Sequence, residues 1–342
     1  MFRKIFNKIF CDIKQFFIEE YKALIVSFFI LILFFYPVNY YIIIGGGISD
    51  IDDRITVVDQ YSSKGSFNIS YVSELKGTVG SYLLSYIIPL WERESVNLYK
   101  YDASESVDDI EFRSLLDLDS ANGNAIYWAY KLANKECDII SSKIYVISVI
   151  SGYETSFKVG DLLLEINGNS FSTLTEYQQY IQTLKGLDSV NIKVLRDNKT
   201  VEFDTKLYNY DDRIILGIYL QTVNEYKTNP EVKLQFESDE SGPSAGLITT
   251  LAIYDKLVEK DLTNSLKIAG TGTIESDGSI GQIGGVRYKL IGAAAGGADV
   301  FLVPSGDNYE ECVKVKKEKN LKIKLVEVSN IEEAIEAIEA LK

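Results

Sequence analysis

Histidine is absent from this 342-residue chain. Its absence excludes Ser-His-Asp and Cys-His nucleophile mechanisms, HExxH zinc sites and histidine-ligated haem. Cysteine is scarce: Cys11, Cys137 and Cys312 lie far apart and form no CxxC pair. This spacing excludes a zinc site built on thiolates and does not indicate a disulfide framework. A hydrolase of this composition must therefore activate its nucleophile without histidine.

Charge and nucleotide-binding motifs narrow the function further. The chain has 35 basic and 49 acidic residues, a net charge of −14, and no Lys/Arg cluster that could hold a phosphate backbone. No GxxxxGK[ST] loop is present, and the glycines at 45–47 and 270–285 lack the GxGxxG spacing of a dinucleotide site. We therefore expect no nucleic-acid partner, no ATPase motor and no cofactor.

The longest uncharged run lies near the N-terminus. No charged side chain occurs from Ala23 to Ser49, and the 22 residues Ala23–Ile44 would form a helix of ~33 Å, enough to cross a bilayer. Basic residues outnumber acidic ones before this run, so the positive-inside rule places residues 1–22 in the cytoplasm and residues 45–342 outside it. We predict a single-pass cell-membrane anchor, preceded by a basic amphipathic segment on the inner leaflet.

Two other interpretations of the run are weaker. A cleaved signal peptide would also be apolar, but a leader of 22 residues is long and no A-x-A-like cleavage site follows the run. A buried core helix would carry charged residues on its outer face, and none occurs in these 27 residues. The membrane anchor is therefore the preferred prediction.

Residues 45–137 begin the region beyond the anchor. Alternating apolar residues predict strands at Arg54–Tyr61 and Ser66–Val72, joined by a Ser-Ser-Lys-Gly turn. Apolar residues at helical spacing predict a helix over Asp119–Lys135, with Ser120 as its N-cap.

The sequence pattern of residues 138–210 differs from that of the preceding region and predicts a small β-rich domain. Three strands are predicted within 144–209, with a helix over Thr173–Gly186. The segment KVGD at 158–161, followed by LLLEING at 162–168, resembles a PDZ domain of the bacterial protease-associated type. That resemblance implies a groove that adds an extended peptide to a sheet edge. The alternative is that these are simply turn residues of an unrelated β domain.

Two segments in the C-terminal part carry candidate chemistry. Gly242-Pro243-Ser244 opens a predicted helix, where free backbone N–H groups stabilise negative charge. Lys289 lies in an apolar helical stripe, although its pKa would have to fall from ~10.4 to roughly 7–8 for it to act as a base near neutral pH. Considered separately, each residue has a structural explanation. The serine could simply cap the helix N-terminus, and the lysine could pack its aliphatic stem on the core while its amine reaches water.

Together the two segments resemble the proteolytic domain of Lon-type serine peptidases. That family carries a GPSAG motif, here 242–246, and a GG-x-x-x-K motif, here 284–289, with Ser244 and Lys289 45 residues apart. The resemblance covers residues 211–342 and implies a Ser244–Lys289 dyad. It also implies supporting roles for Thr271, which would hydrogen-bond the lysine, and for the motif residues Gly242, Pro243, Gly284 and Gly285.

Two positions depart from the family pattern. Family members usually have an acid directly before GPSAG, whereas this chain has Ser241, with Asp239 and Glu240 slightly upstream. The proline of the family's PIGG stretch is replaced by Gln282. Neither departure affects the dyad itself, but both bear on how substrate would be held.

The resulting prediction is an α+β chain with a transmembrane helix, a PDZ-like domain and a Lon-type proteolytic domain. We expect residues 45–137 to supply the first elements of the Lon-like fold, with the PDZ domain inserted in it; a serial order is the alternative. The chain resembles membrane-anchored, PDZ-containing Lon-like endopeptidases, which implies ATP-independent cleavage of extracytoplasmic peptides. A catalytically inactive PDZ scaffold that recruits partner proteins, and a cytoplasm-facing enzyme of inverted topology, are the competing hypotheses.

Overall fold

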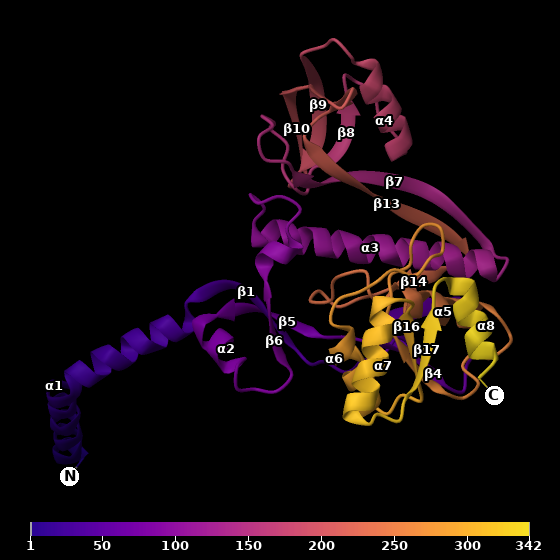
Figure 1. Ribbon diagram of the computed structural model, residues 1–342. Coiled ribbons are helices and arrows are strands. Elements are labelled where there is room, and N and C mark those ends of the chain that lie inside the picture. The colour runs from indigo at the N-terminus through magenta and orange to yellow at the C-terminus, as the bar shows by residue number, and fades with distance from the viewer. Residues whose placement is uncertain (1, 342) are drawn as a thin grey trace. The chain divides into compact units, whose positions relative to one another are not determined.

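The computed structural model describes residues 2–341, apart from the side chains of residues 2–13 and 16–18 (Figure 1). The chain forms two compact units. One consists of Met1–Ile44 and Ser73–Leu98, and the other of Gly45–Val72 and Tyr99–Lys342. The second unit holds every residue that the sequence assigns to catalysis.

The first unit combines helices with a small antiparallel sheet. Its helices are α1 (Phe2–Phe35) and α2 (Val79–Leu84), and its strands β1 (Pro37–Ile44), β5 (Ser73–Thr78) and β6 (Trp91–Ser95) pair in the order β5-β1-β6. A short 3-10 turn, η2 (Val96–Tyr99), follows β6. The apolar centre of β1 forms the core of this unit, since Tyr41, Ile42 and Ile43 are buried.

The predicted transmembrane helix over 23–44 is wrong in its C-terminal part. Proline lacks the N–H that continues a helix and disfavours helical backbone at the residue before it, so α1 ends at Phe35 and Pro37 begins β1. The uncharged part of α1 that remains, 23–35, is only ~20 Å long, against a hydrocarbon core of ~30 Å. Among the described residues, no helix combines the length and the apolar character that crossing a membrane requires. The predicted amphipathic segment 1–22 falls mostly on side chains outside the described residues.

The second unit contains a five-stranded antiparallel sheet that carries the PDZ-like sequence. Its order is β10-β9-β8-β7-β13, and α4 (Leu174–Thr183), capped by Thr173, belongs to the same domain. The strands are β7 (Glu136–Val149), β8 (Leu162–Ile166), β9 (Ser189–Arg196), β10 (Lys199–Lys206) and β13 (Ile218–Asn229), with a small hairpin of β11 (Tyr208–Tyr210) and β12 (Arg213–Ile215). Strand β13, which forms one edge of this sheet, comes after the predicted domain boundary at 210.

A second five-stranded sheet lies at the centre of the catalytic part. Its order is β17-β16-β15-β4-β2, and all pairings are parallel except that of β2 with β4. The strands are β2 (Ile48–Asp50), β4 (Ser66–Ser70), β15 (Lys267–Gly270), β16 (Val300–Pro304) and β17 (Lys324–Val328). Strand β4 thus lies beside β15, about 200 residues later in the chain.

Helices cover both faces of this sheet because side chains alternate along each strand. Ile268 and Leu302 pack into one core with α3 (Val107–Leu132), α5 (Gly246–Leu257) and α8 (Ile331–Glu339). Ala269 and Phe301 face the other core, which α6 (Val286–Ala295) and α7 (Asp307–Lys319) complete. The result is a three-layer α/β/α arrangement.

Elements on both sides of the PDZ-like segment build this layered domain. Helix α3 packs on α5, and a short ladder joins β3 (Ile55–Val57) to β14 (Val232–Leu234). Helix α3 begins well before the predicted start at Asp119, because Ser106 and Asp109 form a capping box at its N-terminus. The predicted strand over Arg54–Tyr61 is reduced to β3, which turns directly after Val57.

Replacing a core leucine of α5 should destabilise the domain that carries the nucleophile. Leu251 is fully buried between α3 and the sheet, so Leu251→Ala should lower the free energy of unfolding by about 2–5 kcal/mol. Val313→Ala on the exposed face of α7 should change it by less than about 0.5 kcal/mol. Urea denaturation in a Trp91→Phe background, with buried Trp128 as the fluorescent reporter, measures both; equal losses would contradict the packing described.

Candidate active site

Ser244 lies in a short loop that leads into α5. Gly242 adopts a left-handed φ of 82° and donates its N–H to the Ser114 carbonyl of α3 at 2.9 Å. The N–H of Gly246 donates to the carbonyl of Pro243 at 3.1 Å, closing a turn around the serine. The helix begins at Gly246 rather than at the proline, so Ser244 precedes the first helical turn and stays partly accessible.

Lys289 comes from the first turns of α6, on the opposite face of the sheet. Gly285 caps α6 in a left-handed conformation, φ 66°, which glycine adopts without strain. The lysine side chain is only 4% exposed, and its Nζ donates to Ser244 Oγ at 2.8 Å and to Thr271 Oγ1 at 3.2 Å. Burial of this kind disfavours a charged amine and favours the neutral form that accepts a proton.

The carboxyl end of β15 holds both side chains in place. Thr271 directly follows this strand, is fully buried, and donates its hydroxyl to the Ser244 carbonyl at 3.1 Å. Gly272 N–H donates to the same carbonyl at 2.9 Å. With its proton committed to Ser244, the Thr271 hydroxyl is left to accept from Lys289, which fixes the direction of the lysine head.

Two backbone amides of the nucleophile loop are available for an anion. The N–H of Leu247 donates to Gly272, whereas those of Ser244 and Ala245 make no hydrogen bond within the described part of the chain. Both amides lie at the N-terminus of α5, where the helix dipole also favours negative charge. This is the arrangement that stabilises the oxyanion of an acyl-transfer intermediate.

The acidic residues upstream of the nucleophile serve structure rather than proton transfer. Glu240 accepts from Arg54 Nε at 2.9 and 3.0 Å and also from its Nη2, while Asp239 and Ser241 are exposed. Burial, the largest single influence, would raise the pKa of Glu240, but the hydrogen bonds from Arg54 and from the Glu237 N–H, together with the Arg54 charge, outweigh it, and the pKa lies below its ordinary value. The carboxylate therefore stays paired with the guanidinium.

Gln282, which replaces a family proline, ties the loop before α6 to the start of α7. Its side-chain amide donates to the Ser305 carbonyl and accepts from the N–H of Asn308 at 3.0 Å. The Asn308 side chain in turn bonds both backbone groups of Ile283. These contacts fix the entry to α6 without touching Lys289.

Comparison with known families agrees with this geometry. A model of the Lon protease (S16) C-terminal proteolytic domain matches residues 237–341, and a PDZ domain model matches residues 132–207. The C-terminal part of the chain is therefore similar to the proteolytic domain of Lon-type serine peptidases. The PDZ domain precedes it in sequence, and its match ends well before β13.

Relatives of the Lon-type domain are much longer proteins. A Lon protease of Desulfatibacillum aliphaticivorans is 33% identical over 97 residues, which cover 28% of this chain and 11% of that protein. A Lon protease of Helicobacter pylori is 27% identical over 150 residues, covering 42% and 17%. A crystal structure of the PDZ domain of an SdrC-like protein from Listeria monocytogenes is 33% identical, with a TM-score of 0.22, covering 22% of this chain and 85% of that one. The chain therefore spans less than a fifth of these proteases.

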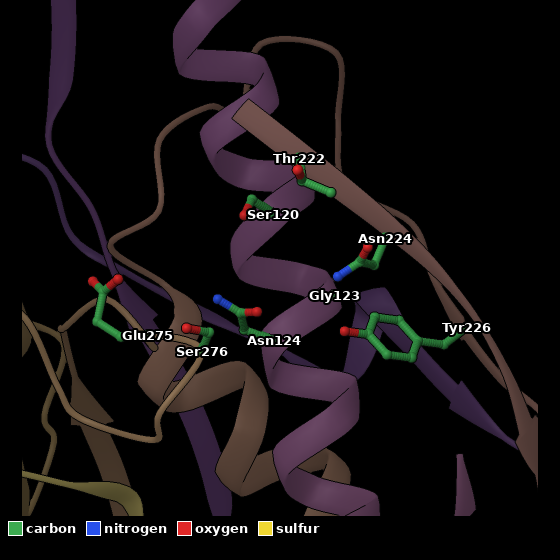
Figure 2. Close-up of a pocket in the computed structure, with 8 residues that line it drawn as sticks. All are labelled: Ser120, Gly123, Asn124, Thr222, Asn224, Tyr226, Glu275 and Ser276. Atoms are coloured by element: carbon green, nitrogen blue, oxygen red, sulfur yellow. The ribbon is translucent and has the colours of Figure 1, made fainter. Parts of the chain in front are cut away.

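Sequence reasoning expected residues 45–137 to supply the first elements of the Lon-like fold, but it missed the contacts by which α3 holds the loops around the site. Besides the Ser114 contact with the nucleophile loop, Asn124 and Trp128 donate to the carbonyls of Ile274 and Ser276 in the loop beyond Thr271. A polar pocket of about 260 Å³ lies between α3, β13 and this loop, away from the dyad residues (Figure 2). The serine and aspartate of the capping box, Ser106 and Asp109, were the signal that could have placed the start of α3.

The two glycines before α6 should respond differently to substitution. A Cβ at Gly285 is strained by its left-handed backbone, so Gly285→Ala should cost about 1 kcal/mol of stability and displace Lys289. A Cβ at Gly284 meets nothing within 4 Å, so Gly284→Ala should leave the melting temperature within about 2 °C. Thermal unfolding of the two variants measures the difference, and equal melting temperatures would contradict it.

Proposed function

We propose that this chain is an ATP-independent serine endopeptidase that uses Ser244 and Lys289 as a catalytic dyad. The observation that supports this most directly is the 2.8 Å separation of Lys289 Nζ and Ser244 Oγ, with the lysine buried. A nucleophile and a base in hydrogen-bond reach, with the base oriented by a third group, satisfy the geometric requirement for nucleophilic catalysis. Thr271 is that third group here.

The reaction would proceed by acyl transfer. Neutral Lys289 takes the Ser244 proton as Oγ attacks the carbonyl carbon, and the oxyanion binds the N–H groups of Ser244 and Ala245. The lysine then gives this proton to the leaving amine as the C–N bond breaks. In the second half a water molecule attacks the ester, losing its proton to Lys289, which returns it to Ser244 Oγ. Protons and electron pairs balance without a cofactor.

The substrate should be a peptide or an exposed segment rather than a folded domain. The sequence holds no GxxxxGK[ST] loop, so the chain itself offers no nucleotide-driven unfolding step. An unstructured segment reaches a buried dyad without such a step, since it has no tertiary structure to lose.

The PDZ domain would recruit such a segment. Strand β13 is at the edge of its sheet, paired only with β7, and α4 packs near its start. An extended peptide can pair with the open side of β13 and lie against α4, the mode by which PDZ domains bind. Strand β13 then runs on to α3, which borders the nucleophile loop.

We also propose that the N-terminal helix holds the peptidase at a membrane, with the catalytic unit on the extracytoplasmic side. Large apolar side chains from Ile25 to Tyr36 are exposed on and just after α1, a continuous surface that water disfavours. The excess of basic residues before this stretch favours the extracytoplasmic side for the catalytic unit, although the uncharged part of α1 alone is shorter than the bilayer core.

Replacement of the nucleophile should abolish proteolysis and identify the substrate. Ser244→Ala removes the attacking oxygen, so new peptide termini that the wild type generates should disappear. Mass spectrometry of surface and secreted peptides, from cells that carry equal amounts of either form, measures this. If the variant lost new peptide termini only from proteins of the cell interior, the proposed extracytoplasmic location would be contradicted. Identical peptide profiles of wild type and variant would favour the inactive PDZ scaffold.

Thr271 should act through the lysine rather than on the substrate. Thr271→Val removes the hydroxyl that accepts from Lys289 and should lower kcat roughly tenfold to a hundredfold, with little change in KM. Thr271→Ser keeps the hydroxyl and should retain most of the activity. The pH profile of kcat should shift in the valine variant only; a shift in neither variant would leave the threonine with a merely structural role.

A further inference from the structure

A cleft lined by both apolar side chains and carboxylates lies beside the nucleophile loop. It has a volume of about 340 Å³ and lies between α3 and the segment that runs from β14 towards Ser244. Leu115, Leu118, Leu234 and Phe236 supply its apolar surface. Asp119, Glu237 and Glu240 add three carboxylates, and Asn122 completes the lining.

The carboxylates of the cleft differ in whether a cation forms an ion pair with them. Arg54 neutralises Glu240 through the hydrogen bonds already described. Within the part of the chain that the structure describes, Asp119 and Glu237 form no ion pair, and the nearby Lys143 is paired with Glu225. Partial burial raises the pKa of Asp119, an effect that Lys143 only partly offsets. Both carboxylates thus lack an ion pair within the described residues, although the charge of Lys143 acts on Asp119 and Arg54 interacts electrostatically with Glu237.

The cleft is within reach of a bound substrate. Glu240 is four residues from Ser244, and four residues span at most ~14 Å. The loop between them is held to α3 by the Gly242–Ser114 hydrogen bond, so the cleft and the nucleophile share one wall. A peptide whose carbonyl lies at Ser244 would thus pass this cleft within a few residues of the scissile bond.

We infer that this cleft binds the lysine or arginine side chain of a peptide substrate, within about four residues of the bond that Ser244 cleaves. Such side chains combine an aliphatic stem with a charged head, which matches a lining that contains both leucine and phenylalanine side chains and carboxylates. A purely apolar side chain would leave the two carboxylates without a partner, and an acidic one would be repelled. The inference rests on the proposed peptidase function and adds a preference for basic substrates.

Cleavage of an unfolded protein tests this preference. β-Casein digested by the full chain should show Lys or Arg enriched severalfold at one or more of the four positions on one side of the cleaved bonds. For a peptide with lysine there, the double variant Asp119→Asn/Glu237→Gln should lower kcat/KM roughly tenfold, with no such loss for the glutamine counterpart. Glu259→Gln, an exposed carboxylate of the same domain, is the matched control. Ser244-dependent cleavage without enrichment would overturn the inference and leave the peptidase proposal intact.

A binding measurement separates the two proposals if cleavage fails. The Ser244→Ala protein is titrated with fluorescein-labelled lysine-containing and glutamine-containing peptides, amidated at the C-terminus so that the PDZ domain has no terminal carboxylate to capture. Tighter binding of the lysine peptide, lost in Asp119→Asn/Glu237→Gln, supports the cleft whatever the outcome for catalysis. Equal affinities overturn it. Absence of any Ser244-dependent cleavage counts against the proposed function alone.

Discussion

The catalytic site depends on where strand β15 ends. Its carboxyl end is the point at which side chains from the two faces of the parallel sheet can meet: Ser244 precedes α5 on one face, and Lys289 lies in α6 on the other. Thr271 and Gly272, just beyond the strand, bind the carbonyl of Ser244, and Thr271 also holds the lysine head. The same position in open parallel sheets commonly receives ligands, because loops from neighbouring strands converge there. A shift of the strand end by one residue would place Thr271 on the wrong face.

The dyad was predictable from the sequence because its two motifs have fixed local geometry. A left-handed glycine before each helix, Gly242 before α5 and Gly285 before α6, sets the direction of the side chain that follows. The partnership of α3 with the nucleophile loop was not predictable in the same way. It requires a contact between Ser114 and Gly242, 128 residues apart with the PDZ domain between them in sequence. Hydrophobic spacing reveals that a helix has a buried face, but not which later segment covers that face.

The N-terminal region shows how composition can mislead about structure. The run from Ala23 to Ile44 is uncharged and mostly apolar, yet its first part is helix and its last eight residues are strand. Pro37 divides it, and the β-branched and aromatic residues that follow, including Ile42 and Ile43, pair with β5 and β6 instead. An apolar run therefore indicates only that its side chains avoid water. The residue types and the position of proline decide whether the backbone forms a helix or a strand. The length of the apolar run alone could not have distinguished one long helix from a helix followed by a strand.

One strand and one helix connect the PDZ sheet to the loops that hold Ser244 and Thr271. Strand β13 begins at the open edge of the PDZ sheet and ends against α3, where Gly123 lets the ring of Tyr226 approach closely. Helix α3 contacts both loops that hold the dyad: Ser114 bonds the one before Ser244, and Asn124 bonds the one after Thr271. A polar pocket lies at the junction, and Thr222 Oγ1 at its wall has no hydrogen-bond partner within the described residues (Figure 2). The junction between the PDZ sheet and the loops around Ser244 is therefore built from polar contacts to α3 as well as from apolar packing.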